Sequence, residues 1–72
     1  MYYRFSYQDG QIRNVDCRSR ADIENHLRID HGGAVVFHGD EEVLLAWKHE
    51  ADWLAGKEPV AAVKRVNPER PP

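Results

Sequence analysis

The sequence predicts a small α+β domain. We expect an N-terminal β-hairpin, a helix, a strand, a second helix and a last strand, with both helices on one face of an antiparallel or mixed sheet. Three observations predict this class: an alternating apolar pattern over residues 1–17, helical spacing over residues 20–30, and short apolar runs at 34–38 and 59–66. With 72 residues in all, residues 1–66 are expected to form one domain. The proline-rich residues 67–72 are expected to be disordered.

Residues 1–17 are expected to fold back on themselves at the Asp9-Gly10 pair, which is typical of a hairpin turn. Alternate side chains of a strand point to opposite faces of the sheet. One face of the first strand is then apolar and suited to the core, and the other is polar and outward. The apolar face carries Met1, Tyr3, Phe5 and Tyr7, and the outward face carries Tyr2, Arg4 and Ser6.

Two turns could join these strands, and they give different registers. A two-residue loop would place Phe5 opposite Asn14, which buries a polar group against an aromatic ring. A type I turn with Gly10 as a left-handed bulge shifts the pairing by one residue. The apolar pattern favours the bulged turn, because a shift of one residue moves every side chain to the other face. Its register pairs Tyr7 with Gln11, Phe5 with Arg13, Tyr3 with Val15 and Met1 with Cys17.

Residues 20–30 have the pattern of a helix. Ser19 is suited to cap its N-terminus, and a pair of glycines at 32 and 33 ends it. Ile23 and Leu27 lie one turn apart and predict a buried stripe. Ile29 lies almost opposite Leu27, so we expect it to cover another element or a second chain.

Residues 41–55 fit two structures. As one helix they would begin at Asp40 and end at Gly56, leaving Leu45 and Trp53 outside the apolar stripe. As a hairpin, residues 43–47 would pair with 35–37, and a short helix over 49–55 would follow. We favour the long helix and keep the hairpin as the alternative. The apolar stripe of the long helix would consist of Val43, Leu44, Trp47, Ala51 and Leu54.

The charge balance excludes some partners. Ten Lys and Arg against twelve Asp and Glu give a net charge of −2, which argues against general nucleic-acid binding. One cysteine, Cys17, excludes an internal disulfide and is expected to be a buried strand residue in a reducing compartment. The sequence shows no signal peptide and no long apolar run, so we expect a cytoplasmic protein without membrane contact.

No motif of an enzyme or of a metal centre is found. The four histidines show no recurring ligand spacing such as His-Glu-x-x-His, and no cysteine cluster accompanies them. Neither serine lies in a Gly-x-Ser-x-Gly motif, and no glycine-rich phosphate loop is present. We therefore expect no catalysis, no cofactor and no metal.

What remains is a set of large side chains without an expected place in the core. We interpret the chain as a non-enzymatic protein–protein interaction module that serves as an adaptor, accessory subunit or phage-type inhibitor of another protein. We also expect it to self-associate as a homodimer. The alternative is a nucleic-acid-binding module that uses an outward Tyr/Arg sheet face. The candidate partner-binding residues are Tyr2, Arg4, Ile29, Leu45 and Trp53, and the cations of the alternative are Arg4, Arg13, Arg18, Arg20, Lys64 and Arg65.

Overall fold

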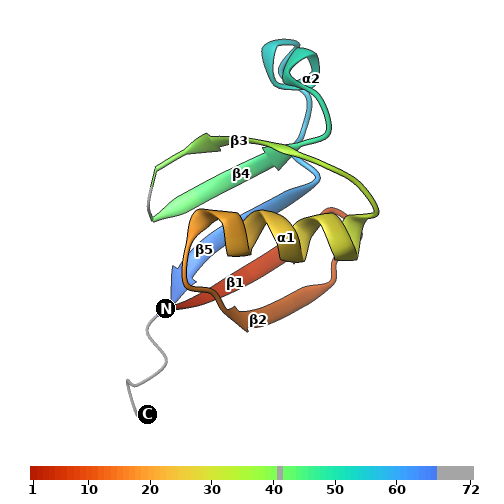
Figure 1. Ribbon diagram of the computed structural model, residues 1–72. Helices are drawn as coiled ribbons and strands as arrows, with labels where there is room; N and C mark the ends of the chain where they lie inside the picture. Colours follow the sequence, from red (N-terminus) through yellow and green to blue (C-terminus); the bar gives the residue numbers. More distant parts are fainter. Residues whose placement is uncertain (41, 67–72) are drawn as a thin grey trace.

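The computed structural model describes residues 1–40 and 42–66. It contains one five-stranded sheet in the order β2-β1-β5-β4-β3, in which all neighbouring strands are antiparallel (Figure 1). The predicted α+β class is confirmed. The elements are β1 (Tyr2–Tyr7), β2 (Ile12–Asp16), α1 (Arg20–His31), β3 (Val36–Gly39), β4 (Val43–Trp47), α2 (Glu50–Leu54) and β5 (Ala61–Val66).

The N-terminal hairpin has the predicted bulged turn. Gly10 has a φ of +96°, in the left-handed region that favours glycine. Its N–H donates to the carbonyl of Tyr7 at 2.9 Å, and the Tyr7 N–H donates to Gln11 at 2.8 Å. The strands pair Phe5 with Arg13 and Tyr3 with Val15, so the predicted register is confirmed.

Helix α1 also follows the prediction. The N–H of Asp22 donates to the hydroxyl of Ser19 at 3.3 Å, and the left-handed Gly32 ends the helix. Ile23 and Leu27 are buried in the core. In Figure 1 the helix runs across the sheet in front of β1 and β5.

The long helix favoured for residues 41–55 is wrong. Residues Val43–Trp47 form β4, which pairs with β3 on one side and β5 on the other. The side chains of this strand are apolar on both faces of the sheet, because Leu44 points to the core and Leu45 to the other face, so its sequence reads as an unbroken apolar run. Leu44 and Ala46 fill the core, and only the five residues of α2 are helical. The hairpin alternative is the one that the structure has.

The face of the sheet toward α1 is the hydrophobic core. Paired residues of neighbouring strands share a face, and β5 lies between β1 and β4, where Val63 pairs with both Phe5 and Leu44. Phe5 also meets His26 of α1 edge to face, with ring centroids 6.2 Å apart. The buried core residues are Phe5, Cys17, Ile23, Leu27, Val35, Leu44, Ala46, Ala61 and Val63.

The expectation that both helices pack on one face is wrong for α2. No residue of α2 is buried, and Figure 1 shows it projecting beyond the ends of β3 and β4. Its Trp53 stacks on His38, which pairs with Leu45 and so lies on the face away from α1. Only α1 therefore covers the core face. The predicted disorder of residues 67–72 lies outside the described residues. No helix in the described part of the chain is long and apolar enough to cross a membrane.

Burial of Cys17 predicts an unreactive thiol. The residue is buried as expected, and burial raises the pKa of the thiol above its ordinary value, with Asp22 and Asp16 adding to the shift. We expect negligible reaction with a thiol-specific disulfide reagent at neutral pH in the folded protein, and full reaction in denaturant. Rapid labelling of the native protein would contradict the burial of this side chain.

Candidate protein-binding face

Among the described helices, α1 covers one face of the sheet and the short α2 lies beyond the ends of β3 and β4, so neither covers the middle of the face away from α1 (Figure 1). We call the face away from α1 the outer face. Its members follow from the strand register, because residues paired across strands point to the same side. The outer face consists of Tyr2, Arg4 and Ser6 from β1; Ile12, Asn14 and Asp16 from β2; Val36 and His38 from β3; Val43, Leu45 and Trp47 from β4; and Ala62, Lys64 and Val66 from β5.

A row of neighbouring residues crosses the middle of the outer face over all five strands. Ser6 pairs with Ala62, Ala62 with Leu45, and Leu45 with His38. At the β2 edge the row ends on Ile12, which is 62% exposed. The small side chains at positions 6 and 62 make the centre of the face shallow, so another layer of protein can approach the backbone there.

One end of the outer face is cationic. Arg4 and Lys64 are paired across β1 and β5, with Tyr2 one step further along β1. Within the described residues, the guanidinium of Arg4 donates only to the amide oxygen of Asn14, at 3.4 Å. Lys64 has no ion pair in the described part of the chain. Two like charges therefore stand side by side, and the outer-face carboxylate at this end, Asp16, is paired with the N-terminal amine at 3.0 Å.

The other end carries an aromatic cluster, which we call the aromatic corner: His38, Trp47 and Trp53. The rings of His38 and Trp53 are stacked, with centroids 3.5 Å apart, and His38 meets Trp47 edge to face at 5.7 Å. The Nε2 of His38 lies 2.8 Å from a carboxylate oxygen of Glu50. Trp53 stays 38% exposed, and its neighbour Leu54 is 72% exposed.

The aromatic corner also attaches α2 to the sheet. Trp47 is only 6% exposed, and its indole N–H donates to the carbonyl of Lys57 at 2.8 Å, in the loop that follows α2. The side chain of Lys57 lies 3.6 Å from Asp52. These contacts hold a short helix in place although it buries nothing of its own.

Four of the five predicted partner-binding residues share the outer face or its rim. Tyr2 and Arg4 lie toward the cationic end, while Leu45 and Trp53 both meet His38. Ile29 does not join them, because it is 72% exposed on α1, which covers the opposite face. Sequence reasoning missed His38 and Leu54 as members of this surface. No pattern within residues 43–47 distinguishes a strand from a helix, so the sequence carries no signal that places His38 beside Leu45.

Most of the other cations considered for nucleic-acid binding lie on the α1 side. Arg13 forms an ion pair with Asp30 of α1. The guanidinium of Arg20 lies over the ring of Phe37, 5.8 Å from its centroid. Arg65 pairs with Glu42 at 3.3 Å. The predicted basic surface is therefore reduced to Arg4 and Lys64 on the outer face.

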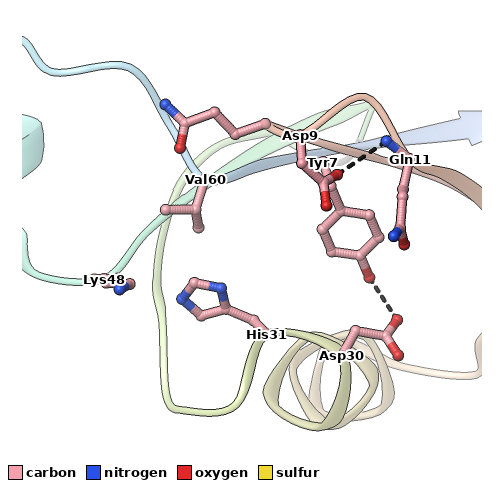
Figure 2. Close-up of a pocket in the computed structure, with 8 residues that line it drawn as sticks. Tyr7, Asp9, Gln11, Asp30, His31, Lys48 and Val60 are labelled. Carbon is pink, nitrogen blue, oxygen red and sulfur yellow. Dashed lines mark hydrogen bonds between the residues drawn. The ribbon is translucent and has the colours of Figure 1, made fainter.

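A second feature is an open cleft of about 440 Å³ between the β1–β2 turn, the C-terminal end of α1 and the loop after β4 (Figure 2). The hydroxyl of Tyr7 donates to Asp30 at 2.6 Å, and Arg13 binds the other oxygen of the same carboxylate. Figure 2 shows Lys48 and His31 away from this pair. The cleft is lined by Tyr7, Gln8, Asp9, Gln11, Asp30, His31, Lys48 and Val60.

The polar groups of the cleft join α1 to the hairpin. Burial raises the pKa of Tyr7 far above its ordinary value, and the hydrogen bond to Asp30 raises it further. At neutral pH the phenol is protonated and occupied as a donor. It is therefore neither a nucleophile nor a base, and the Asp30 carboxylate already has two partners.

This arrangement predicts an alkaline loss of stability that depends on Tyr7. The raised pKa means that the folded state holds the phenol proton more tightly than the unfolded chain does. The contribution of the protonated Tyr7 phenol to the free energy of unfolding is complete below about pH 10 and falls as the pH rises further. By pH 11 we expect a loss of roughly 1 kcal/mol, reduced by partial exposure. Urea unfolding of the native chain and of Tyr7→Phe from pH 8 to pH 11 measures it. Tyr2→Phe is the control, and a parallel decline in Tyr7→Phe would contradict the assignment.

The histidines are dispersed over the molecule. His26 contacts Phe5, His31 lines the cleft, His38 is part of the aromatic corner, and His49 precedes α2. Within residues 1–40 and 42–66, no group of three or more His, Cys, Asp and Glu side chains is placed to hold a metal ion. The described histidines therefore supply no candidate metal centre.

Comparison of the chain with known protein families, curated proteins and solved structures finds no match. The outer face is the feature of the molecule that indicates a function.

Proposed function

We propose that this chain is a non-enzymatic protein-interaction module that binds through its outer face. It would act as an adaptor, an accessory subunit or an inhibitor of another protein, in the cytoplasm and without a cofactor. Self-association through the same face is part of the proposal.

The apolar content of the open sheet face is the observation that carries this proposal. An antiparallel sheet with one solvated face normally has polar residues there. Here the middle row carries Ile12, which is 62% exposed, and the paired neighbours Ala62 and Leu45, which are half-buried. Exposed apolar side chains on an open sheet face are typical of protein-binding sites.

The aromatic corner adds the features of an interaction hot spot. Tryptophan is enriched among the residues that contribute most to protein–protein affinity. Trp53 is half-exposed and held in one orientation by its stack on His38, so it loses little freedom on binding. Leu54, the next residue in α2, is 72% exposed.

Affinity capture from an extract of the source organism tests the proposal. The double variant Leu45→Ala/Trp53→Ala should lose specific protein partners that the native chain retains. Ile29→Ala is the matched control, because it removes an exposed aliphatic side chain from the opposite side of the molecule. Circular dichroism checks that all three proteins are folded. Capture of the same proteins by all three would contradict binding through the outer face.

Nucleic-acid binding is the second candidate, favoured by the pairing of Arg4 with Lys64 beside Tyr2. An aromatic ring next to two cations can stack on a base while the cations contact phosphates. A gel-shift assay with mixed single-stranded DNA and RNA at low salt tests it, with Tyr2→Ala/Arg4→Ala as the variant. The proposal requires binding that weakens with salt and is lost in the variant. Absence of binding by the native chain at low salt would contradict it.

A further inference from the structure

We propose that the occupant of the outer face is a second copy of this chain. The two copies would form a two-fold dimer in which the cationic end of each face lies over the α2 end of the other. This inference rests on the proposed function, since it uses the same face, and it adds the partner and its orientation.

The distribution of charge along the outer face supports a self-complementary arrangement. Arg4 and Lys64 lie at one end without a carboxylate partner. At the other end Glu50 is half-exposed, and its contact is with a histidine. Asp16, the carboxylate at the cationic end of the face, is already paired with the N-terminal amine at 3.0 Å, so Arg4 and Lys64 gain a carboxylate partner by meeting the α2 end of the other copy. If like ends met, four cations would be juxtaposed, which is unfavourable.

A single two-fold axis brings the cationic end of each copy over the α2 end of the other. In such an interface every contact occurs twice, so Lys64 of each copy would face Glu50 of the other. A two-fold axis that runs between the two copies, parallel to their outer faces and close to Leu45, brings these residues together. Leu45 pairs with Ala62, two residues from Lys64 on β5, and also with His38, which contacts Glu50. Leu45 therefore lies between the two charged ends and would pack against its own counterpart.

The remaining outer-face side chains fit the same arrangement. Arg4 lies one strand beyond Lys64, so it would come over the aromatic corner of the partner. A guanidinium over the exposed indole of Trp53 is a favourable cation–π contact. The small side chains of Ser6 and Ala62 would let the two sheets approach to about 10 Å, the usual spacing of packed sheets.

The size of the face sets the expected affinity. Five strands about 4.8 Å apart and some five residues long present about 400 Å² per copy. A standard interface buries about 800 Å² per partner. The projecting Trp53 and Leu54 add to the sheet area without reaching a large obligate interface. We therefore expect a reversible dimer with a dissociation constant in the micromolar range.

Sedimentation equilibrium of the full chain tests for the dimer. We expect a monomer–dimer equilibrium between about 1 µM and 1 mM, with weaker association at high salt because charge pairs contribute. A strict monomer over this range would overturn the proposal. A dimer of unchanged affinity in Leu45→Ala/Trp53→Ala would also overturn it, because that dimer would use another surface.

Charge reversal tests the orientation. Lys64→Glu and Glu50→Lys each place like charges opposite one another in a homodimer, and we expect at least tenfold weaker self-association from each. Mixing the two variants restores both opposite-charge contacts in a heterodimer, so the mixture should associate about as tightly as the native chain. Arg28→Glu, the same charge change on the α1 side of the molecule, is the control and should leave association unchanged.

The outcomes distinguish this inference from the proposed function. Native-like association of either charge variant alone, or no gain on mixing, would overturn the orientation. Both positions are exposed. Circular dichroism is the check that each variant is folded. Should Glu50→Lys be misfolded, Arg4→Glu/Lys64→Glu tests the cationic end separately and must weaken the dimer. A monomeric native chain that still captures partners through the outer face would overturn the dimer, and with it the self-association part of the proposed function, but leave binding of other proteins through this face intact.

Discussion

Replacing Phe5 by alanine is expected to leave most of the chain unfolded at room temperature. Phe5 is fully buried at the centre of the core, where it pairs with Val63 and contacts His26. Truncation of a buried phenylalanine costs about 3–5 kcal/mol. A single core in a chain of this size supplies only about 3–5 kcal/mol of net stability. The loss is therefore comparable to the whole free energy of unfolding.

Far-ultraviolet circular dichroism and urea unfolding measure this effect, with two variants as controls. Phe5→Leu keeps most of the volume and should cost about 1–1.5 kcal/mol, leaving the protein folded. Tyr2→Ala lies on the same strand but on the outer face, so its unfolding midpoint should change little. Native-like stability of Phe5→Ala would show that the core is not organised around this ring.

The burial of Phe5 could be predicted because local pattern alone decides it. Alternation along β1 places it on the apolar face, and the bulged turn at Gly10 fixes what lies opposite. Helix α1 was equally predictable, since Ser19 and Gly32 mark both ends and its apolar stripe has helical spacing. In both elements every local signal agrees with the final fold.

Residues 41–55 could not be decided in this way. The same apolar side chains satisfy a helical stripe and a strand that is apolar on both faces. The structure selects the strand because β4 gains two neighbours, β3 and β5, and β5 is far away in the sequence. Long-range pairing of this kind overrides helix propensity and leaves no mark within the segment itself.

Only some residues of the candidate site could be predicted from the sequence, because long-range strand pairing brings the others together. Tyr2 and Arg4 could be placed outward by alternation along one strand. Their neighbour Lys64 could not be placed, because it reaches Arg4 only through the insertion of β5 between β1 and β4. The contact of His38 with Trp53 likewise depends on how the short α2 returns to the sheet. A binding face assembled from five strands requires the topology before its members can be named.

Replacing Gly39 by alanine is expected to disrupt the β3–β4 hairpin. Gly39 has a φ of +133°, and an added Cβ would lie 2.3 Å from the carbonyl oxygen of Val43. That oxygen also accepts the N–H of Asp40 at 3.0 Å, so the methyl group would compete with a hydrogen bond of the turn. The contacted atom is backbone and cannot move aside by a change of rotamer. Strain and the lost hydrogen bond together should cost about 3 kcal/mol.

Gly10→Ala is the matched control, because Gly10 also has a positive φ but an added Cβ would meet nothing within 4 Å. It should show the conformational cost alone, about 1–2 kcal/mol. Urea unfolding compares the two variants, and amide hydrogen exchange should show the loss of protection in β3 and β4 for Gly39→Ala. Because this hairpin carries His38 and Leu45, Gly39→Ala should also abolish self-association even where β1 and β2 remain protected. Equal unfolding midpoints for the two variants would contradict the close approach at Gly39.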